Sequence, residues 1–298
     1  MANILIIGCG DVGLRTARRL APRHRLYALA RSPQSAQRMR EAGITPIPGD
    51  LDDYASLARL AGIADWILHF APPTAHGEYD MRTRRLLSIL GKGRILPRRL
   101  VYISTSGVYG DCKGEVIDET RTPAPQNERA LRRLDAEQLV RQWGRRCGVA
   151  VSILRAPGIY AAERLPIERL QRRVPALCAE DDVFTNHIHA DDLAQITVNA
   201  LFRACGGRIY HASDDHPMYM GEYFTRVATT FGLPAPPRIT RAEAAATLPS
   251  SRLSFMRESR QLLNHRIKRE LRVRLRYADV DALLKRAVPP GVHDEVAF

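Results

Sequence analysis

The sequence lacks most features that mark secreted, metal-binding or membrane proteins. Its five cysteines are scattered without a C-x-x-C pair, so neither a disulfide framework nor a zinc knuckle is predicted. No apolar run approaches the roughly 20 residues that a membrane helix needs. No charged-then-apolar leader opens the chain. We therefore expect free thiols, no metal site, no membrane partner and a cytoplasmic location.

Lysine is also scarce, although the chain is strongly basic. Its 298 residues hold 45 Lys and Arg against 32 Asp and Glu, a formal net charge of +13, yet only four of the basic residues are lysines. No basic block is interleaved with aromatic residues, as a platform for single-stranded nucleic acid would require. We interpret the surplus as arginine-rich solvated surface and expect no nucleic-acid partner.

Short apolar runs alternate with helical segments along the first half of the chain. Strands are expected at 3–7, 25–31, 44–50, 65–71, 99–105 and 149–156, with a later one at 208–213. Helices are expected at 81–90, 126–146 and 191–202. This alternation predicts an α/β fold with a doubly wound parallel sheet that is covered by helices on both faces. A smaller second part is expected to begin near residue 156.

A glycine-rich loop follows the first expected strand and precedes a helical pattern. Its G-x-G-x-x-G consists of Gly8, Cys9, Gly10, Asp11, Val12 and Gly13. Glycines at these positions permit a tight turn and a close approach of the backbone to a pyrophosphate, which the helix N-terminus attracts. The motif in this context predicts a Rossmann-like dinucleotide site.

The end of the second expected strand lacks the acidic residue that would hold a ribose 2′-hydroxyl. Arg31 and Ser32 stand there instead, and a guanidinium beside a hydroxyl suits a 2′-phosphate. We therefore predict NADP (NADPH) as the cofactor in preference to NAD. Asp50, at the end of the third strand, could accept from the adenine amino group or could cap the next helical segment.

Several motifs together resemble an extended short-chain dehydrogenase/reductase of the NAD-dependent epimerase/dehydratase family. Besides the glycine loop they are GDL at 49–51, HFAPP at 69–73, STSGVYG at 104–110, LRAPGIYA at 154–161, NHIHADDLA at 186–194 and NHRIKREL at 264–271. They occur in the expected order through nearly the whole chain. The resemblance implies that Leu51, Ala71, Pro72 and Pro157 also line the cofactor site.

The resemblance further implies a domain division and a homodimer. Residues 1–155 plus about 187–215 would form the NAD(P)-binding Rossmann domain, and 156–186 plus 216–298 a smaller substrate-binding domain. Helices near 78–92 and 126–146 would join two subunits. The second of these has an apolar stripe at Ala136, Leu139, Val140 and Trp143, which could face either a partner or its own sheet.

The catalytic Tyr-x-x-x-Lys pair of the family is missing. When Glu137 is matched to the family's pattern, Arg133 takes the lysine position and Arg129 the tyrosine position, while Thr105 takes the hydroxyl position. Arginine stays protonated at neutral pH and cannot exchange a proton as tyrosine does. Arg133 could still hold the cofactor ribose.

Three hypotheses follow from this departure. Another group, such as Tyr160, Tyr109, His187 or a water, supplies the proton; or Arg129 binds an anionic substrate and stabilises an oxyanion; or no chemistry occurs. His187 and His189 alternate on an extended segment, which is a poor arrangement for a metal centre.

These observations predict an NADP-binding oxidoreductase or epimerase-like enzyme that acts on a small polar, anionic substrate. The alternative is a catalytically silent NADP-binding redox sensor or regulator. An enclosed polar pocket beside the nicotinamide position would favour the enzyme, and a closed or apolar surface there would favour the sensor.

Overall fold

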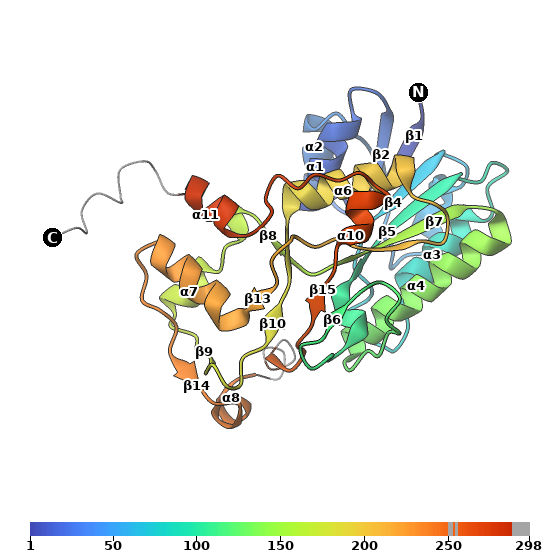
Figure 1. The fold of residues 1–298 in the computed structure, drawn as a ribbon. Coiled ribbons are helices and arrows are strands. Elements are labelled where there is room, and N and C mark those ends of the chain that lie inside the picture. Colours follow the sequence, from blue (N-terminus) through green and yellow to red (C-terminus); the bar gives the residue numbers. More distant parts are fainter. Residues whose placement is uncertain (250–252, 254–255, 288–298) are drawn as a thin grey trace.

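A computed structural model describes residues 1–249, 253 and 256–287. Its centre is a seven-stranded sheet with the order β12-β7-β5-β4-β1-β2-β3, in which every neighbouring pair is parallel (Figure 1). The strands are β1 (Asn3–Ile7), β2 (Arg25–Ala30), β3 (Thr45–Pro48), β4 (Trp66–His69), β5 (Arg99–Thr105), β7 (Ala150–Ala156) and β12 (Ile209–His211). The predicted Rossmann-like α/β fold is confirmed.

Helices cover both faces of this sheet because the strands are apolar on both sides. Ile4 and Ile6 of β1 contribute to one hydrophobic cluster, whereas Leu5 and Ile7 contribute to the other. The first face is covered by α1 (Asp11–Leu20), α2 (Pro33–Glu41), α6 (Ala190–Arg203) and α10 (His265–Arg269). The second is covered by the 3-10 helix η1 (Ala55–Leu60), α3 (Met81–Leu90) and α4 (Glu128–Cys147). None of the helices in the described ranges is long and apolar enough to cross a membrane.

The apolar stripe of α4 faces its own sheet. Ala136, Val140 and Trp143 are buried in the second cluster, and Leu139 is partly buried against it. Of the two orientations that the sequence left open, the structure has the one in which this helix covers the sheet. The stripe is therefore not evidence for a subunit interface.

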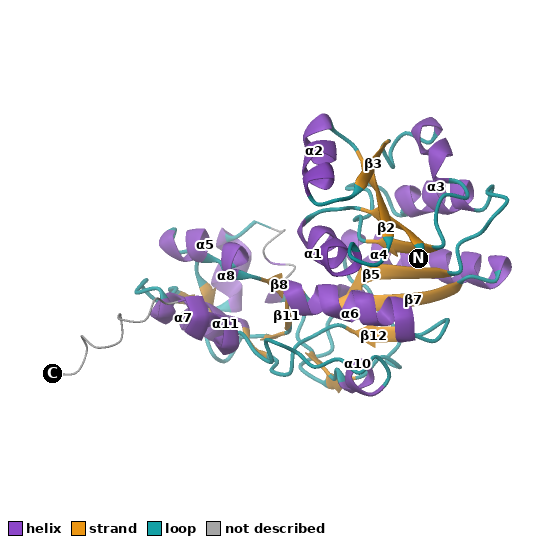
Figure 2. Cartoon of the chain, turned by 90° about the horizontal axis from the view of Figure 1, so that it is seen from above, coloured by secondary structure: helices purple, strands orange, loops and turns teal. Residues whose placement is uncertain are grey.

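A second group of elements lies to one side of the sheet (Figure 2). It comprises β8 (Gly158–Tyr160), η3 (Ala162–Arg164), α5 (Ile167–Gln171), β9 (Ala176–Leu177), β10 (Phe184–Thr185), β11 (His187–His189), β13 (Met218–Tyr219), α7 (Met220–Thr230), β14 (Arg238–Ile239), α8 (Arg241–Thr247) and α11 (Asp281–Ala287). Parallel pairing of β8 with β11 links it to α6. His187 and His189 stack on Tyr223 and Tyr277 there, and the described residues contain no group of three metal-binding side chains.

A buried ion pair fixes α4 to the sheet. The Arg155 Nη2 of β7 lies 2.7 Å from Glu137 Oε2 of α4, and both side chains are 2% exposed. Ser104 Oγ at the end of β5 donates to Glu137 Oε1 at 2.6 Å. The carboxylate of Glu137 therefore joins α4 to the carboxyl ends of two neighbouring strands.

We predict that Glu137→Gln lowers the free energy of unfolding by about 3–5 kcal/mol, because Arg155 is left as a buried charge without its counterion. Urea unfolding followed by circular dichroism measures the loss. Glu115→Gln is the matched control, because Glu115 pairs with Arg121 at the surface and its loss should cost less than about 1 kcal/mol. Equal effects of the two substitutions would contradict the prediction.

Candidate functional site

The glycine loop is held tightly against the end of β4. Gly8 has a φ of +87°, and a Cβ there would lie 2.5 Å from the backbone nitrogen of Ala71. A Cβ on Gly13 would lie 3.0 Å from the carbonyl oxygen of Gly8. Glycine is therefore required at position 8 by both backbone angle and space, and the loop turns directly from β1 into α1.

The N-terminus of α1 is open, in contrast to those of several other helices. Side chains of Ser32, Asp80 and Asn127 cap α2, α3 and α4, but the N-cap residue of α1 is Gly10, which has no side chain to cap it. A Cβ on Gly10 would have no atom within 4 Å. The first-turn N–H groups can therefore receive an anion, and the loop fits the pyrophosphate of a dinucleotide.

A groove of about 290 Å³ runs from this loop to the ends of β5 and β7. It is lined by Gly8, Gly10, Asp11, Val12, Gly13, Phe70, Ile103, Ser104, Thr105, Arg133, Ala156, Pro157, Ile159, Arg164 and Leu193. The structure thus brings the predicted Thr105, Arg133 and Pro157 to the glycine loop. Cys9 does not line the groove, and burial raises the pKa of its thiol to about 11, so it stays protonated at neutral pH.

The ends of β2 and β3 lie side by side, as Gly49 N donates to the Ala30 carbonyl at 3.1 Å. The side chain of Arg31 is exposed and makes no hydrogen bond or ion pair with the described residues. The Ser32 hydroxyl already accepts from Ser35 N as the cap of α2. Asp50 Oδ1 accepts from Asp52 N at 2.9 Å and so closes a turn before η1. Arg31 is thus the freer of the two predicted phosphate-binding side chains.

The remaining predicted contacts differ in exposure. Leu51 and Ala71 are buried in the core, whereas Pro72 is exposed. Ala71 serves as the surface against which Gly8 packs. Pro72 is the one of the three whose side chain is open to a ligand.

Arg133 is fixed at the junction of β4 and β5. Its Nη1 donates to Tyr102 Oη and to the Ile103 carbonyl, each at 3.0 Å, and lies 3.5 Å from the Ala71 carbonyl. Burial raises the pKa of Tyr102 to about 12, so the phenol that meets Arg133 is neutral at pH 7. The sequence alone did not single out Tyr102, which lies three residues before Thr105.

A second cavity, of about 340 Å³, adjoins the groove and shares Thr105, Arg133 and Pro157 with it. Its other lining residues are Ser106, Gly107, Arg129, Gly158, Phe184, Thr185, Asn186, Met220, Glu258 and Arg260. Three arginines and one glutamate are its charged side chains. The lining, as far as the structure describes it, contains no Tyr, Lys, His or Cys.

The glutamate and one arginine of this cavity hold each other. Arg260 Nη1 lies 2.9 Å from Glu258 Oε2, and Asn127 Nδ2 donates to Glu258 Oε1 at 2.9 Å. Asn186 is fixed by the backbone of the same segment, at Arg260 and Leu262. Glu258 and Arg260 were missed at the sequence level because no motif surrounds them, whereas Asn186 lies within the recognised NHIHADDLA segment.

Comparisons with known proteins agree with this architecture. Residues 4–211 match the model of the "NAD dependent epimerase/dehydratase family". The chain belongs to this family. This chain is 25% identical over 223 residues to a 4-hydroxy-2-methyl-3-oxo-4-farnesyl-3,4-dihydroquinoline-1-oxide ketoreductase of Stigmatella aurantiaca. That match spans 70% of this chain and 66% of the ketoreductase, so less than two thirds of the relative's length is covered.

Solved structures resemble this chain over nearly its whole length. A functionally unknown conserved protein from Silicibacter pomeroyi superposes with a TM-score of 0.79 at 26% identity, over 96% of this chain and 98% of that one. A dTDP-glucose 4,6-dehydratase from Streptomyces venezuelae with bound NAD has a TM-score of 0.76 at 20% identity, over 95% of each chain. At 20% identity, the similarity to the dehydratase concerns the fold alone.

Three residues considered as alternative proton donors lie outside the cavity of this epimerase/dehydratase-family protein. Tyr160 is buried and its Oη donates to the Asp279 carbonyl at 2.9 Å, and burial raises the pKa of this phenol well above its ordinary value. Tyr109 Oη lies 2.5 Å from His211 Nε2. His187 packs against Tyr223. Each of these side chains is committed to packing or to an internal hydrogen bond.

Thr105 and Arg129 differ from these three because both line the cavity. The Thr105 hydroxyl accepts from Gly107 N at 3.2 Å, which orients it at the turn after β5. Desolvation lowers the pKa of Arg129, and Glu258 acts in the opposite direction. An arginine nonetheless stays charged at neutral pH. The cavity therefore combines a positioned hydroxyl with fixed positive charge.

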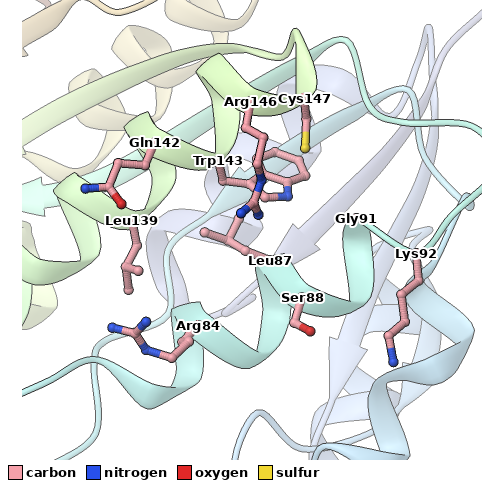
Figure 3. Close-up of a pocket in the computed structure, with 10 residues that line it drawn as sticks. All are labelled: Arg84, Leu87, Ser88, Gly91, Lys92, Leu139, Gln142, Trp143, Arg146 and Cys147. Carbon is pink, nitrogen blue, oxygen red and sulfur yellow. The ribbon is translucent and has the colours of Figure 1, made fainter.

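A third cavity, of about 430 Å³, lies between α3 and α4 and shares no lining residue with the other two (Figure 3). Figure 3 shows Leu139 and Arg146 reaching from α4 toward α3. The charged lining residues are Arg84, Lys92 and Arg146, with no acidic residue among them. This basic groove is on the helices that the sequence analysis assigned to a dimer interface.

Proposed function

We propose that this family member is an NADP(H)-dependent oxidoreductase or epimerase-like enzyme whose substrate is a small organic anion. The observation that carries the proposal is the junction at Thr105 and Arg133, where the cofactor groove opens into a polar cavity with a surplus of arginines. A carboxylate or phosphate suits such a cavity, because guanidinium groups bind these anions with charge-assisted hydrogen bonds. Binding experiments with different anions would identify the substrate.

Preference for NADP rests on Arg31. Its guanidinium makes no hydrogen bond or ion pair with the described residues, it directly follows β2, and no acid occupies the position that would repel a 2′-phosphate. Asp52, the nearby acid whose pKa Arg31 helps to lower, is held mainly by Arg82. Arg31 thus keeps its charge available to a ligand.

The bound cofactor would supply or accept a hydride, and the chain's own residues would position the two reactants. Arg133 would hold the nicotinamide ribose, and the Thr105 hydroxyl would orient the substrate oxygen. Arg129 would stabilise negative charge that develops on that oxygen. Since arginine does not exchange protons at neutral pH, the Glu258 carboxylate or a water is the group left in the cavity that could carry the proton.

The alternative function is a catalytically silent NADP-binding sensor that reports redox state to a partner. A sensor would not need an open polar cavity beside the nicotinamide position. The cavity of about 340 Å³ with its lining of hydroxyl, amide and charged side chains supports the enzyme instead. A cofactor that binds tightly without any turnover of anionic substrates would favour the sensor.

We predict that NADPH binds more tightly than NADH, and that Arg31→Asp reverses the order. Loss of the charge-assisted contact should weaken NADPH binding by about 1–3 kcal/mol. Fluorescence titration with each cofactor measures both affinities. Arg40→Asp on the exposed face of α2 makes the same charge change away from the groove and should leave the order unaltered. Equal affinities of the wild type for NADPH and NADH would contradict the prediction.

Arg129→Ala should weaken anion binding in the second cavity while leaving NADPH binding unchanged, because Arg129 lines that cavity and not the cofactor groove. Calorimetric titration of the NADP-loaded protein with 2-oxo acids and sugar phosphates checks the first effect, and NADPH oxidation measures turnover. Neutral ketones and aldehydes should react very slowly. Arg145→Ala, an exposed substitution on the same helix, is the control. Brisk turnover of neutral carbonyls would contradict an anion-directed cavity.

We also propose that two copies can pair through α3 and α4. A two-fold interface brings the same surface of each copy together. Arg84, Lys92 and Arg146 would then face the same cations of the partner. The charge of this groove therefore opposes pairing, and screening by salt or binding of anions would relieve the repulsion.

For this pairing we predict a dimer whose population rises between about 0.05 M and about 0.5 M salt, opposite to an interface held by ion pairs. Light scattering at micromolar concentration measures the population. Arg146→Glu should strengthen pairing at low salt, whereas Arg203→Glu at the end of α6 should have little effect. A monomer at every salt concentration would contradict the proposed pairing through α3 and α4.

A further inference from the structure

Arg164 places a positive charge at the glycine loop from a distant part of the chain. It ends η3, just after β8, and it lines the same groove as Gly8, Gly10 and Gly13. Its Nη2 lies 3.1 Å from Asp11 Oδ2. A guanidinium in this position is within one side chain's reach of the first turn of α1.

Asp11 creates an electrostatic difficulty for the cofactor. It is the first residue of α1, so its carboxylate stands beside the N–H groups that would receive a pyrophosphate. Two anions at one helix N-terminus repel each other unless a cation neutralises one of them. Binding of a dinucleotide therefore requires that Asp11 keep a positive partner.

Arg15 is that permanent partner. Its Nε donates to Asp11 Oδ1 at 2.7 Å and its Nη1 donates to Asp191 Oδ1 at 2.7 Å, while Nη2 contacts Glu163. Three carboxylates from three elements thus hold one guanidinium, and the Arg15 side chain is 19% exposed. Each of the three guanidinium nitrogens of Arg15 has a carboxylate partner, which fixes this side chain in place.

Arg164 is held far less tightly. Asp11 is its one side-chain partner in the described part of the chain, and the Arg164 side chain is 36% exposed. Because Arg15 donates to Asp11 Oδ1, the contact of Arg164 with Oδ2 can be exchanged while the carboxylate keeps one cationic partner. A phosphate that enters the groove would be the stronger partner for a guanidinium.

We propose that Arg164 is a clamp for the cofactor pyrophosphate: it exchanges Asp11 for a phosphate oxygen when the dinucleotide binds, while Arg15 retains Asp11. This inference rests on the proposed function, since it needs a bound dinucleotide. Because Arg164 belongs to η3, the exchange draws a segment outside the central sheet over the cofactor. The clamp thus couples cofactor retention to the part of the chain that carries β8.

Fluorescence titration with NADPH tests the clamp. Arg164→Ala should weaken binding by at least about tenfold, and Arg164→Lys should restore part of the loss, because lysine keeps the charge without the planar fork. Arg172→Ala is the matched control, since Arg172 pairs with Glu168 at the surface of the same region. Adenosine 2′-monophosphate, which has no pyrophosphate, should bind the wild type and Arg164→Ala alike.

The Asp11→Asn background separates a clamp from simple neutralisation of Asp11. If Arg164 contacts the phosphate, Arg164→Ala still weakens NADPH binding when Asp11 is replaced. If Arg164 only neutralises Asp11, the loss disappears in that background and the clamp is wrong. Unchanged NADPH affinity in Arg164→Ala would also overturn the clamp alone, whereas a wild type that binds neither cofactor would overturn the proposed function itself.

Discussion

The ion pair between Glu137 and Arg155 determines where the rest of the site can lie. It is buried, it joins α4 to β7, and through Ser104 it also holds the end of β5. Arg133 lies one helical turn before Glu137, so this attachment directs it toward the junction of the groove and the cavity. Arg155 also lies over the Tyr109 ring, 4.6 Å from its centroid. A charge pair in the core of a sheet thus sets the positions of side chains that a ligand would meet.

Arginine supplies most of the charged side chains of the second cavity, which limits the kind of chemistry that its lining could support. Arg129, Arg133 and Arg260 line this cavity, and a guanidinium supplies positive charge and directed hydrogen bonds without exchanging protons. Rate acceleration would therefore depend on positioning and electrostatic stabilisation more than on general acid catalysis. Such a cavity would select its substrate by charge.

The sequence was sufficient to predict the parallel sheet and the glycine loop, because both depend on local patterns. Alternating apolar strands and helices placed all seven strands of the sheet, and the spacing of Gly8, Gly10 and Gly13 placed the loop. It could not resolve the orientation of the α4 stripe, because an apolar face suits a sheet and a partner equally well. Arg164, Glu258 and Arg260 were not predicted, since their roles arise from contacts between segments more than 100 residues apart or outside any motif.

The hydrogen bond from Tyr160 to the Asp279 carbonyl has a consequence for the end of the chain. Tyr160 ends β8, η3 begins two residues later, and Asp279 precedes α11. This hydrogen bond therefore attaches α11, the last described helix, to β8. The chain continues from β8 into η3, where Arg164 lines the edge of the groove. Val280, Leu283 and Leu284 pack in the same hydrophobic cluster as Tyr160. A chain truncated before Asp279 would expose this cluster and free β8 at one end, so residues 279–287 act as a structural brace for a ligand site whose described lining they do not join.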